Sequence, residues 1–397
     1  MVVTADTVFT DRKILVLAPQ PFFQERGTPI AVKLLVEELA RLGFDVHLLV
    51  FHEGEDVAMD GVTLHRIPAI PGIKNIPPSI SFKKIICDGV MFFSMVRLLK
   101  KYDFDLVHAV EESVFLVRVV SLFSGIPYVY DMDSSLVIQM VDKLSFLRPF
   151  RSLLRFFERS AVRGSNGVMA VCRELEEIAR DYASEKRIAR LEDISLLDEN
   201  AHSAELLWER YDISGPIMLY VGNLEGYQGI DLLLESFQLA RLRGCQGNLV
   251  IIGGTEETIA KYREKAQDLE IGENTVFCGM RPVSLLAHYL RQADILLSPR
   301  IQGNNTPMKL YSYLASGKVV LATRLPTHTQ VLDDGFACLV EPVAESMAAA
   351  MVTLLEDKDL RERLGKKGRE VAEQNHSIGS FRKKLKAFYQ GVIDDMQ

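Results

Sequence analysis

One polar loop in the C-terminal half of the chain holds the residue types best suited to binding an anion. It combines two cations with four residues that hydrogen bond or open a helix: Arg300, Asn304, Asn305, Thr306, Pro307 and Lys309. Thr306 is a natural N-cap, and Pro307 suits the first helical position. The amide groups of such a helix start, with Lys309 in the first turn, suit a phosphate or sugar oxygens. The loop is therefore predicted to bind an anionic ligand.

The segments around this loop must position it. An apolar run at residues 295–298 has the length of a buried strand, and Gly317 ends a predicted helix at residues 308–316. The next strand is predicted at residues 319–322. Strand, loop, helix and strand make one βαβ unit. Its loop lies at the carboxyl end of a strand, where open parallel sheets bind ligands.

Two carboxylates follow another apolar run in the N-terminal half. Asp131 and Asp133 end a predicted strand that starts at Tyr128, and strand alternation places them on the same side. One of them could orient or deprotonate a hydroxyl group, so both are candidate catalytic residues. His108 ends the neighbouring predicted strand, and a lone histidine is more often structural than catalytic. The glutamates after it, at positions 111 and 112, could instead cap the next helix.

A third candidate is the loop after the first predicted strand, residues 13–19. Arg26, Gly27 and Thr28 could offer a cation and backbone amides to a phosphate or an acceptor hydroxyl. The alternative is that Thr28 and the proline after it simply start a helix. A G-x-G-x-x-G dinucleotide fingerprint is absent from this loop.

Strands separated by helices recur along the whole chain. This alternation predicts α/β domains with parallel sheets covered on both faces. The polar, acidic stretch at residues 192–209 is predicted to separate two such domains, at residues 1–198 and 209–375. A helical tail follows at residues 376–397. The predicted fold is two doubly wound, Rossmann-like domains.

Composition limits the class of protein. The chain has 397 residues, of which 48% are apolar and 25% charged, so it can bury two large cores and disorder is not expected. The net charge of −7 argues against broad nucleic-acid binding. The five cysteines are scattered without a CxxC pair, which favours buried thiols in a reducing compartment and gives no sign of a metal site. With no signal peptide or transmembrane segment apparent in the sequence, a cytoplasmic location is expected.

The segment PMKLYSYLASGKVVLAT, residues 307–323, resembles the signature helix of GT-B glycosyltransferases, especially the retaining enzymes of family 4. That family usually has two glutamates with seven residues between them, and their positions fall on Asn304 and Ser312. The segment YVGNLEGYQG matches the family's phosphate-binding loop at Gly222. There the family's arginine and lysine are replaced by Asn223 and Gln228. The resemblance implies that Arg300 and Lys309 take over the diphosphate of the donor.

The same resemblance implies a function. A retaining transferase would move a sugar from a nucleotide-diphosphate sugar to a glycan or lipid-linked acceptor, in the synthesis of a cell-surface polysaccharide or glycolipid. It would need no metal and no cofactor besides the donor substrate. The leaving diphosphate is thought to help deprotonate the acceptor, so no protein nucleophile is required. In the GT-B fold the last helix crosses back to the N-terminal domain, which suits residues 376–397.

Two alternatives stay open at this level. The missing glutamates and the missing arginine–lysine pair would also fit a GT-B protein that binds a nucleotide sugar with little or no catalysis. A GT-B sugar-nucleotide epimerase would need further acids and histidines that the sequence does not reveal. The sugar, the base and the acceptor are not readable from the sequence.

A basic amphipathic stretch at residues 143–163 indicates one further partner. On a helix its basic residues share one face and its apolar residues the other: Arg148, Arg151, Arg155 and Arg159 against Phe150, Leu153, Leu154 and Phe157. Such helices favour an anionic membrane surface, which would suit a lipid-linked acceptor and peripheral attachment to the inner face of the plasma membrane. The alternative is an ordinary helix with its phenylalanines in the core.

Overall fold

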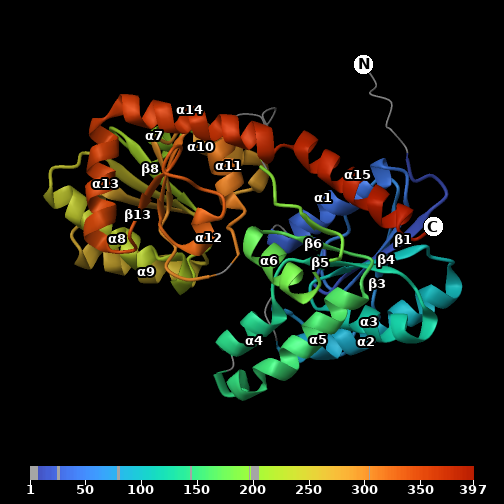
Figure 1. Cartoon of the computed structure of the whole chain (residues 1–397). Helices are drawn as coiled ribbons and strands as arrows, with labels where there is room; N and C mark the ends of the chain where they lie inside the picture. The colour runs from blue at the N-terminus through green and yellow to red at the C-terminus, as the bar shows by residue number, and fades with distance from the viewer. Residues whose placement is uncertain are drawn as a thin grey trace. The chain divides into compact units, whose positions relative to one another are not determined.

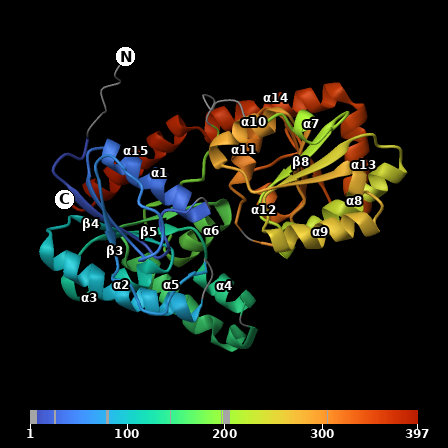
Figure 2. The same cartoon turned by 180° about the vertical axis from the view of Figure 1, so that it is seen from behind.

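The computed structural model describes residues 8–24, 27–77, 81–143, 145–195, 197, 205–303 and 305–397. The chain divides into two compact units (Figures 1 and 2). Unit 1 comprises Met1–Glu192 with Arg382–Gln397, and unit 2 comprises Asp193–Phe381. Each unit is a parallel sheet with helices alternating along the chain, so the predicted fold of two doubly wound α/β domains is confirmed.

Unit 1 is built on a seven-stranded sheet with the order β3-β2-β1-β4-β5-β6-β7. Its strands are β1 Lys13–Ala18, β2 Asp45–Val50, β3 Val62–Arg66, β4 Leu106–Val110, β5 Tyr128–Met132, β6 Gly167–Ala170 and β7 Ile188–Arg190. Its helices are α1 Gly27–Arg41, α2 Phe82–Lys101, α3 Ser113–Ser124, α4 Leu136–Lys143, η1 Ser145–Phe150, α5 Arg151–Gly164 and α6 Arg173–Tyr182, with most of α15 Ile378–Asp394. The strand order reverses between β1 and β4, which is where doubly wound sheets bind ligands.

Unit 2 is built on a six-stranded sheet with the order β10-β9-β8-β11-β12-β13. Its strands are β8 Ile217–Val221, β9 Asn248–Ile252, β10 Thr275–Gly279, β11 Ile295–Ser298, β12 Val319–Thr323 and β13 Cys338–Val340. Its helical segments are α7 Leu207–Arg210, η2 Gly226–Gln228, α8 Ile230–Leu242, α9 Glu256–Asp268, η3 Gly272–Asn274, η4 Val283–Leu285, α10 Leu286–Arg291, α11 Lys309–Ala315, α12 Pro326–Thr329, α13 Ala344–Glu356 and α14 Lys358–Asn375. Here the order reverses between β8 and β11, so the loops after these two strands are the expected ligand edge.

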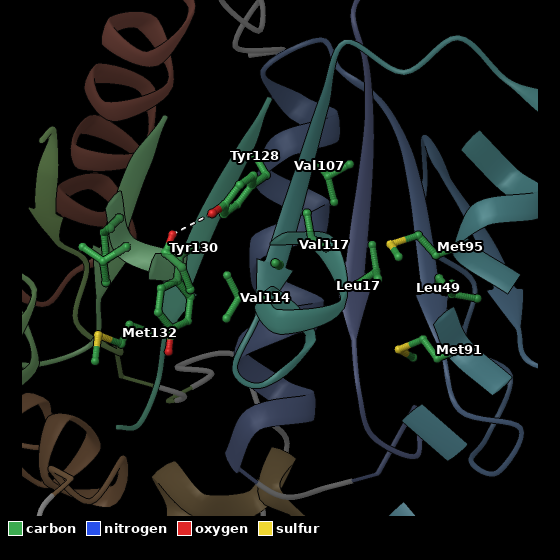
Figure 3. Packing of buried hydrophobic residues seen from close by; sticks show 14 of the residues in the cluster. Leu17, Leu49, Met91, Met95, Val107, Val114, Val117, Tyr128, Tyr130 and Met132 are labelled. Atoms are coloured by element: carbon green, nitrogen blue, oxygen red, sulfur yellow. Dashed lines mark hydrogen bonds between the residues drawn. The ribbon is translucent and has the colours of Figure 1, made fainter. Parts of the chain in front are cut away.

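The core of unit 1 shows why its strands read as apolar runs. Alternate residues of β4 and β5 face α2 and α3, and the two methionines of α2 pack toward Leu17 and Leu49 of the sheet (Figure 3). Tyr128 is fully buried in this core, and its hydroxyl donates to the carbonyl oxygen of Ala161 at 2.7 Å. Asp131 therefore lies on the opposite face of β5, away from Tyr130 and Met132.

The last helix closes that opposite face of unit 1. The side chains of Leu385, Phe388 and Tyr389 in α15 are buried. Arg382 donates to both carboxylate oxygens of Glu38 in α1, each at 2.7 Å, and Glu38 is only 8% exposed. A second pair, Arg187 with Asp395, lies in solvent at the end of the helix. The buried pair fixes where α15 meets α1.

Replacing Arg382 by Met should loosen α15. The carboxylate of Glu38 would stay buried without its bidentate partner, at a cost of about 2 kcal/mol in the free energy of opening. Arg187→Met removes the exposed pair and should cost less than about 1 kcal/mol. Hydrogen exchange of the α15 amides measures both, and equal losses in the two variants would contradict this account of the docking.

Candidate active site

The loop between β11 and α11 differs at its end from the sequence-based expectation. The helix begins at Lys309 with Met308 as the N-cap residue, so the predicted N-cap at Thr306 and helix start at Pro307 are wrong. The amides of Leu310 and Tyr311 donate to the carbonyl oxygens of Pro307 and Met308, at 3.0 and 3.2 Å. Two amides of the first turn are therefore already bonded. The chemistry of this loop rests on its side chains.

Lys309 is the most unusual of these side chains. Its Nζ is enclosed, lies 4.0 Å from the ring centroid of Tyr220, and has no hydrogen-bond partner among the described residues. Burial, with a smaller effect from nearby Arg300, lowers the pKa of Lys309 well below its ordinary value. A buried ammonium group normally has a carboxylate beside it. Lys309 instead lies against the aromatic face of Tyr220. An anionic ligand could therefore still pair with its ammonium group.

Arg300 is the second cation of the loop. Its Nη1 donates to the carbonyl oxygen of Asn305 at 2.8 Å and to the hydroxyl of Thr327 at 3.1 Å. Its guanidinium carbon lies 5.1 Å from the ring centroid of Tyr227, and its buried Nε makes no hydrogen bond in the described structure. Arg300 thus fixes the loop through Nη1, while its Nε is left without a hydrogen bond in the described structure.

The loop after β8 meets the loop after β11. The Ile301 amide donates to the carbonyl oxygen of Tyr227 at 3.0 Å. A Cβ on Gly229, whose φ is 75°, would lie 2.0 Å from the carbonyl oxygen of Pro299, so only glycine allows this approach. A Cβ on Gly222 would lie 3.5 Å from Nζ of Lys309 and 2.9 Å from the hydroxyl of Tyr220. Glycine at both positions brings the two loops together around Lys309.

Four enclosed polar atoms without hydrogen-bond partners occur on these two loops of the described structure. They are Gln228 Oε1, Arg300 Nε, Thr306 Oγ1 and Lys309 Nζ. Each such group costs about 1–3 kcal/mol if it stays unsatisfied. All four were predicted from the sequence as donor-binding residues, and two are cations. The arrangement can neutralise an anion and hydrogen bond to it.

Three other predicted donor residues are exposed, buried within a helix, or outside the described residues. Asn223 is exposed and its Nδ2 lies 3.4 Å from the hydroxyl of Tyr227, while its carbonyl oxygen accepts from Tyr220 at 2.6 Å. Ser312 is fully buried within α11. Asn304 lies outside the described residues. The Asn305 carbonyl holds the loop in place, as described above.

A buried, neutral histidine links the two strands beside this loop. The sequence analysis did not single it out. His328 is fully buried, with Nδ1 donating to the carbonyl oxygen of Thr323 at 2.7 Å and Nε2 accepting from Ser298 at 2.9 Å. Burial lowers the pKa of His328 to about 4, with smaller effects from Lys309 and Arg300. The imidazole therefore adds no charge and ties β11 to β12 at the edge where the loop starts.

In unit 1 the two predicted catalytic aspartates have different surroundings. Asp131 accepts from Nε2 of His108 at 3.0 Å, and Nδ1 of His108 accepts from the hydroxyl of Tyr389 at 2.7 Å. His108 and Tyr389 are fully buried, so this chain joins β5 and β4 to α15. His108 is structural here. Asp133 lies half-buried just beyond β5 and stays the better candidate for a hydroxyl group.

Two of the remaining predicted residues of unit 1, Gly27 and Thr28, lie at the start of α1. Helix α1 begins at Gly27, so Thr28 lies inside its first turn and is not its N-cap. Arg26 lies outside the described residues. Glu112 occupies the N-cap position of α3, but its side chain forms an ion pair with buried Lys84 and makes no cap hydrogen bond.

A buried glutamate that the sequence analysis passed over organises the loop after β5. Glu158 of α5 is fully buried and accepts from the hydroxyls of Ser135, at 2.9 Å, and Tyr182, at 3.0 Å. It also accepts from the amides of Leu136 and Val137, and so caps α4 from another helix. Burial raises the pKa of Glu158, and these hydrogen bonds oppose the rise. Glu158 therefore holds the chain two residues beyond Asp133.

Neither a metal site nor a membrane span is visible in what the structure describes. Among the described residues, no cluster of three or more His, Cys, Asp or Glu side chains could hold a metal ion. None of the helices within these ranges has both the length and the apolar content to cross a bilayer.

Comparison with known proteins gives two family matches that together span most of the chain. The sequence model of the family described as glycosyl transferases group 1 matches residues 211–371, and that of the glycosyl transferase 4-like domain matches residues 26–191. The chain is similar to phosphatidyl-myo-inositol mannosyltransferase of Mycolicibacterium smegmatis, with 25% identity over 88% of this chain and 86% of that protein. It is also similar to alpha-monoglucosyldiacylglycerol synthase of Streptococcus pneumoniae, with 22% identity over 94% and 84%.

Solved structures share the fold. Sucrose-phosphate synthase from Thermosynechococcus elongatus superposes with a TM-score of 0.78 at 19% identity, covering 97% of this chain and all of that one. The Anabaena protein HepE in complex with UDP gives a TM-score of 0.72 at 13% identity, covering 95% and 99%. Together with the two family matches, these likenesses lead to one conclusion: the chain belongs to the group 1, family-4-like glycosyltransferases of the GT-B fold and is a glycosyltransferase.

Proposed function

We propose that this enzyme transfers a sugar, with retention, from a nucleotide-diphosphate sugar to a glycan or lipid-linked acceptor. The observation that carries the proposal is the enclosed Lys309 ammonium group, which has no hydrogen-bond partner in the described structure, together with the spare Nε of Arg300. Two cations on one loop suit a diphosphate, which carries about two negative charges. They would replace the arginine and lysine that relatives carry where this chain has Asn223 and Gln228.

The acceptor class rests on the relatives. The printed names of two similar proteins describe a mannosyltransferase acting on phosphatidyl-myo-inositol and a synthase of a glucosyldiacylglycerol. Both names contain a lipid. A lipid-linked acceptor at the inner face of the plasma membrane, in glycolipid or cell-surface polysaccharide synthesis, is therefore our first proposal for this chain, and a soluble glycan is the second.

The chemistry that follows needs positioning and charge more than it needs a nucleophile. The bond between the anomeric carbon and the diphosphate oxygen breaks, and the acceptor oxygen bonds to the same carbon. The acceptor proton moves to the departing diphosphate, while Lys309 and Arg300 offset the charge that develops there. Asp133 is proposed to orient the acceptor hydroxyl. No cofactor or metal is part of this scheme.

One set of observations favours a slower alternative. Asn304 and Ser312 stand where relatives carry glutamates, and Asp131 is already engaged by His108. A protein that binds a nucleotide sugar with little turnover would show such changes. Calorimetry with a panel of nucleotide sugars, followed by a donor-hydrolysis assay without acceptor, separates the two. Tight binding with neither hydrolysis nor transfer to any acceptor extract would favour the alternative.

Replacing Lys309 by Met should weaken nucleotide binding and leave the fold intact. The affinity for the tightest-binding member of a UDP, GDP and ADP panel should fall about 10- to 100-fold, because one charged hydrogen bond is lost. The free energy of unfolding should stay equal or rise, because an unpaired buried cation is removed. Lys318→Met, in the same βαβ unit, is the matched control. Unchanged affinity in Lys309→Met would remove this residue from the donor site.

At pH values between the lowered pKa of Lys309 and its ordinary value, nucleotide binding should take up a proton at this residue. Its pKa is low in the free protein and would return toward its ordinary value of 10.5 beside a diphosphate. Affinity should therefore be greatest below the lowered pKa and should fall as pH rises through the window between the two values. Calorimetry in two buffers with different ionisation enthalpies counts the protons. Lys309→Met corrects for protons bound by the nucleotide itself, and identical uptake in that variant would refute the linkage.

A further inference from the structure

Helix α5 and the 3-10 turn before it expose an unusual set of large apolar side chains. Those of Phe146, Phe150, Leu153, Phe156 and Phe157 are 68%, 54%, 52%, 62% and 51% exposed. A surface helix normally turns such residues to the core. Here the inner side of α5 is taken by Glu158, Ala161 and Val162. The alternative interpretation, in which these phenylalanines belong to the core, is therefore wrong.

Large apolar side chains are also exposed on a neighbouring helix, α3. Arg118 of α3 donates to the hydroxyl of Ser160 in α5 at 3.3 Å, so the two helices lie side by side. They cover the same face of the unit 1 sheet (Figures 1 and 2). On α3, Leu122 is 62% exposed and Phe123 is 88% exposed. A soluble protein rarely leaves so many large apolar groups together in water without a binding role.

Positive charge borders these apolar residues. Arg148, Arg151, Arg155 and Arg159 are exposed, and none of them forms an ion pair within the described part of the chain. Three of them recur every fourth residue and so form one row along α5. The single acid between residues 145 and 164 is Glu158, which is buried. All exposed charges of this segment are thus positive, although the net charge of the chain is −7.

We propose that this surface docks on an anionic lipid bilayer. The docking face is defined as the exposed side chains of η1 and α5: Phe146, Arg148, Phe150, Arg151, Leu153, Arg155, Phe156, Phe157 and Arg159. Aromatic rings enter the boundary between headgroups and acyl chains, and guanidinium groups beside them bind lipid phosphates. A second copy of the chain fits poorly, because a two-fold contact would set one arginine row against the other.

The helix that carries the docking face is also hydrogen bonded to the loop that carries Asp133. The outer side of α5 would meet the bilayer, while Glu158 on its inner side holds Ser135 and the start of α4. A lipid-linked acceptor would then be presented near this loop of unit 1. The docking itself does not require the transferase chemistry proposed above, so each can fail without the other.

The test is co-sedimentation of the full chain with vesicles of phosphatidylcholine, alone or with about one-third phosphatidylglycerol, at several salt concentrations. The wild-type chain should bind the anionic vesicles at least about tenfold more tightly. Arg151→Gln with Arg155→Gln should weaken that binding about thirty-fold and flatten its salt dependence. Phe156→Ser with Phe157→Ser should weaken it about tenfold or more at every salt concentration.

Leu242→Ser with Met280→Ser is the matched control, because these unit 2 residues are 77% and 76% exposed. It should bind vesicles like the wild-type chain. All variants alter exposed side chains, and circular dichroism verifies that they fold. Absence of binding to anionic vesicles, or equal binding by all variants, would overturn the proposal. A concentration-dependent dimer that the phenylalanine variant disrupts, without vesicle binding, would assign the face to a second copy. Nucleotide affinity measured in the same variants should not change.

Discussion

A buried ammonium group without a carboxylate is the constraint on which unit 2 depends. Enclosing an unpaired charge costs several kcal/mol, and a desolvated contact with an aromatic face returns about 2 kcal/mol. The fold keeps Lys309 over Tyr220 at a net cost, and burial shifts the pKa of Lys309 downward as a result. A ligand that supplies negative charge would remove that cost. The unpaired charge that destabilises the free protein would then favour binding of the donor.

The surrounding architecture fixes Lys309 and Arg300 at one edge of the sheet. The reversal of strand order between β8 and β11 places two loops at neighbouring strand ends. Gly229 lets one loop touch the other, and Arg300 with Thr327 fixes the Asn305 carbonyl from the opposite side. His328 stays neutral beneath them and adds no competing charge. Rigid backbone contacts therefore carry the side chains that the ligand would meet.

The sequence predicted the two α/β domains and the strand that precedes the candidate loop, because apolar runs and glycines are local signals. The apolar run at residues 295–298 is strand β11, with both ends where the sequence predicted them. The start of α11 was not predicted correctly. Thr306 and Pro307 have the right types for a helix start, but contacts of Arg300 and Thr327 with the Asn305 carbonyl hold the preceding loop out of the helix. Thr327 lies 22 residues from Asn305 in the chain, so a local sequence pattern does not contain this contact.

The same limit explains unit 1. The pattern in α5 separates arginines from phenylalanines, but both sets are exposed, and the buried side of the helix carries Glu158, Ala161 and Val162. On the buried side, the Glu158 carboxylate accepts hydrogen bonds from Ser135 and Tyr182. This orientation of the helix leaves the phenylalanines exposed. Likewise, alternation placed Asp131 and Asp133 on one side of the strand, but could not reveal that buried His108 contacts Asp131 there and is bonded in turn to Tyr389. Buried polar groups were the least predictable part of the molecule.

The most direct test of the central claim is a crystal structure with the bound nucleoside diphosphate. The account predicts a phosphate oxygen within about 3 Å of Nζ of Lys309, with Nε of Arg300 also bonded to the diphosphate. A diphosphate bound elsewhere on unit 2, with Lys309 still resting on Tyr220 and touching no phosphate, would contradict it.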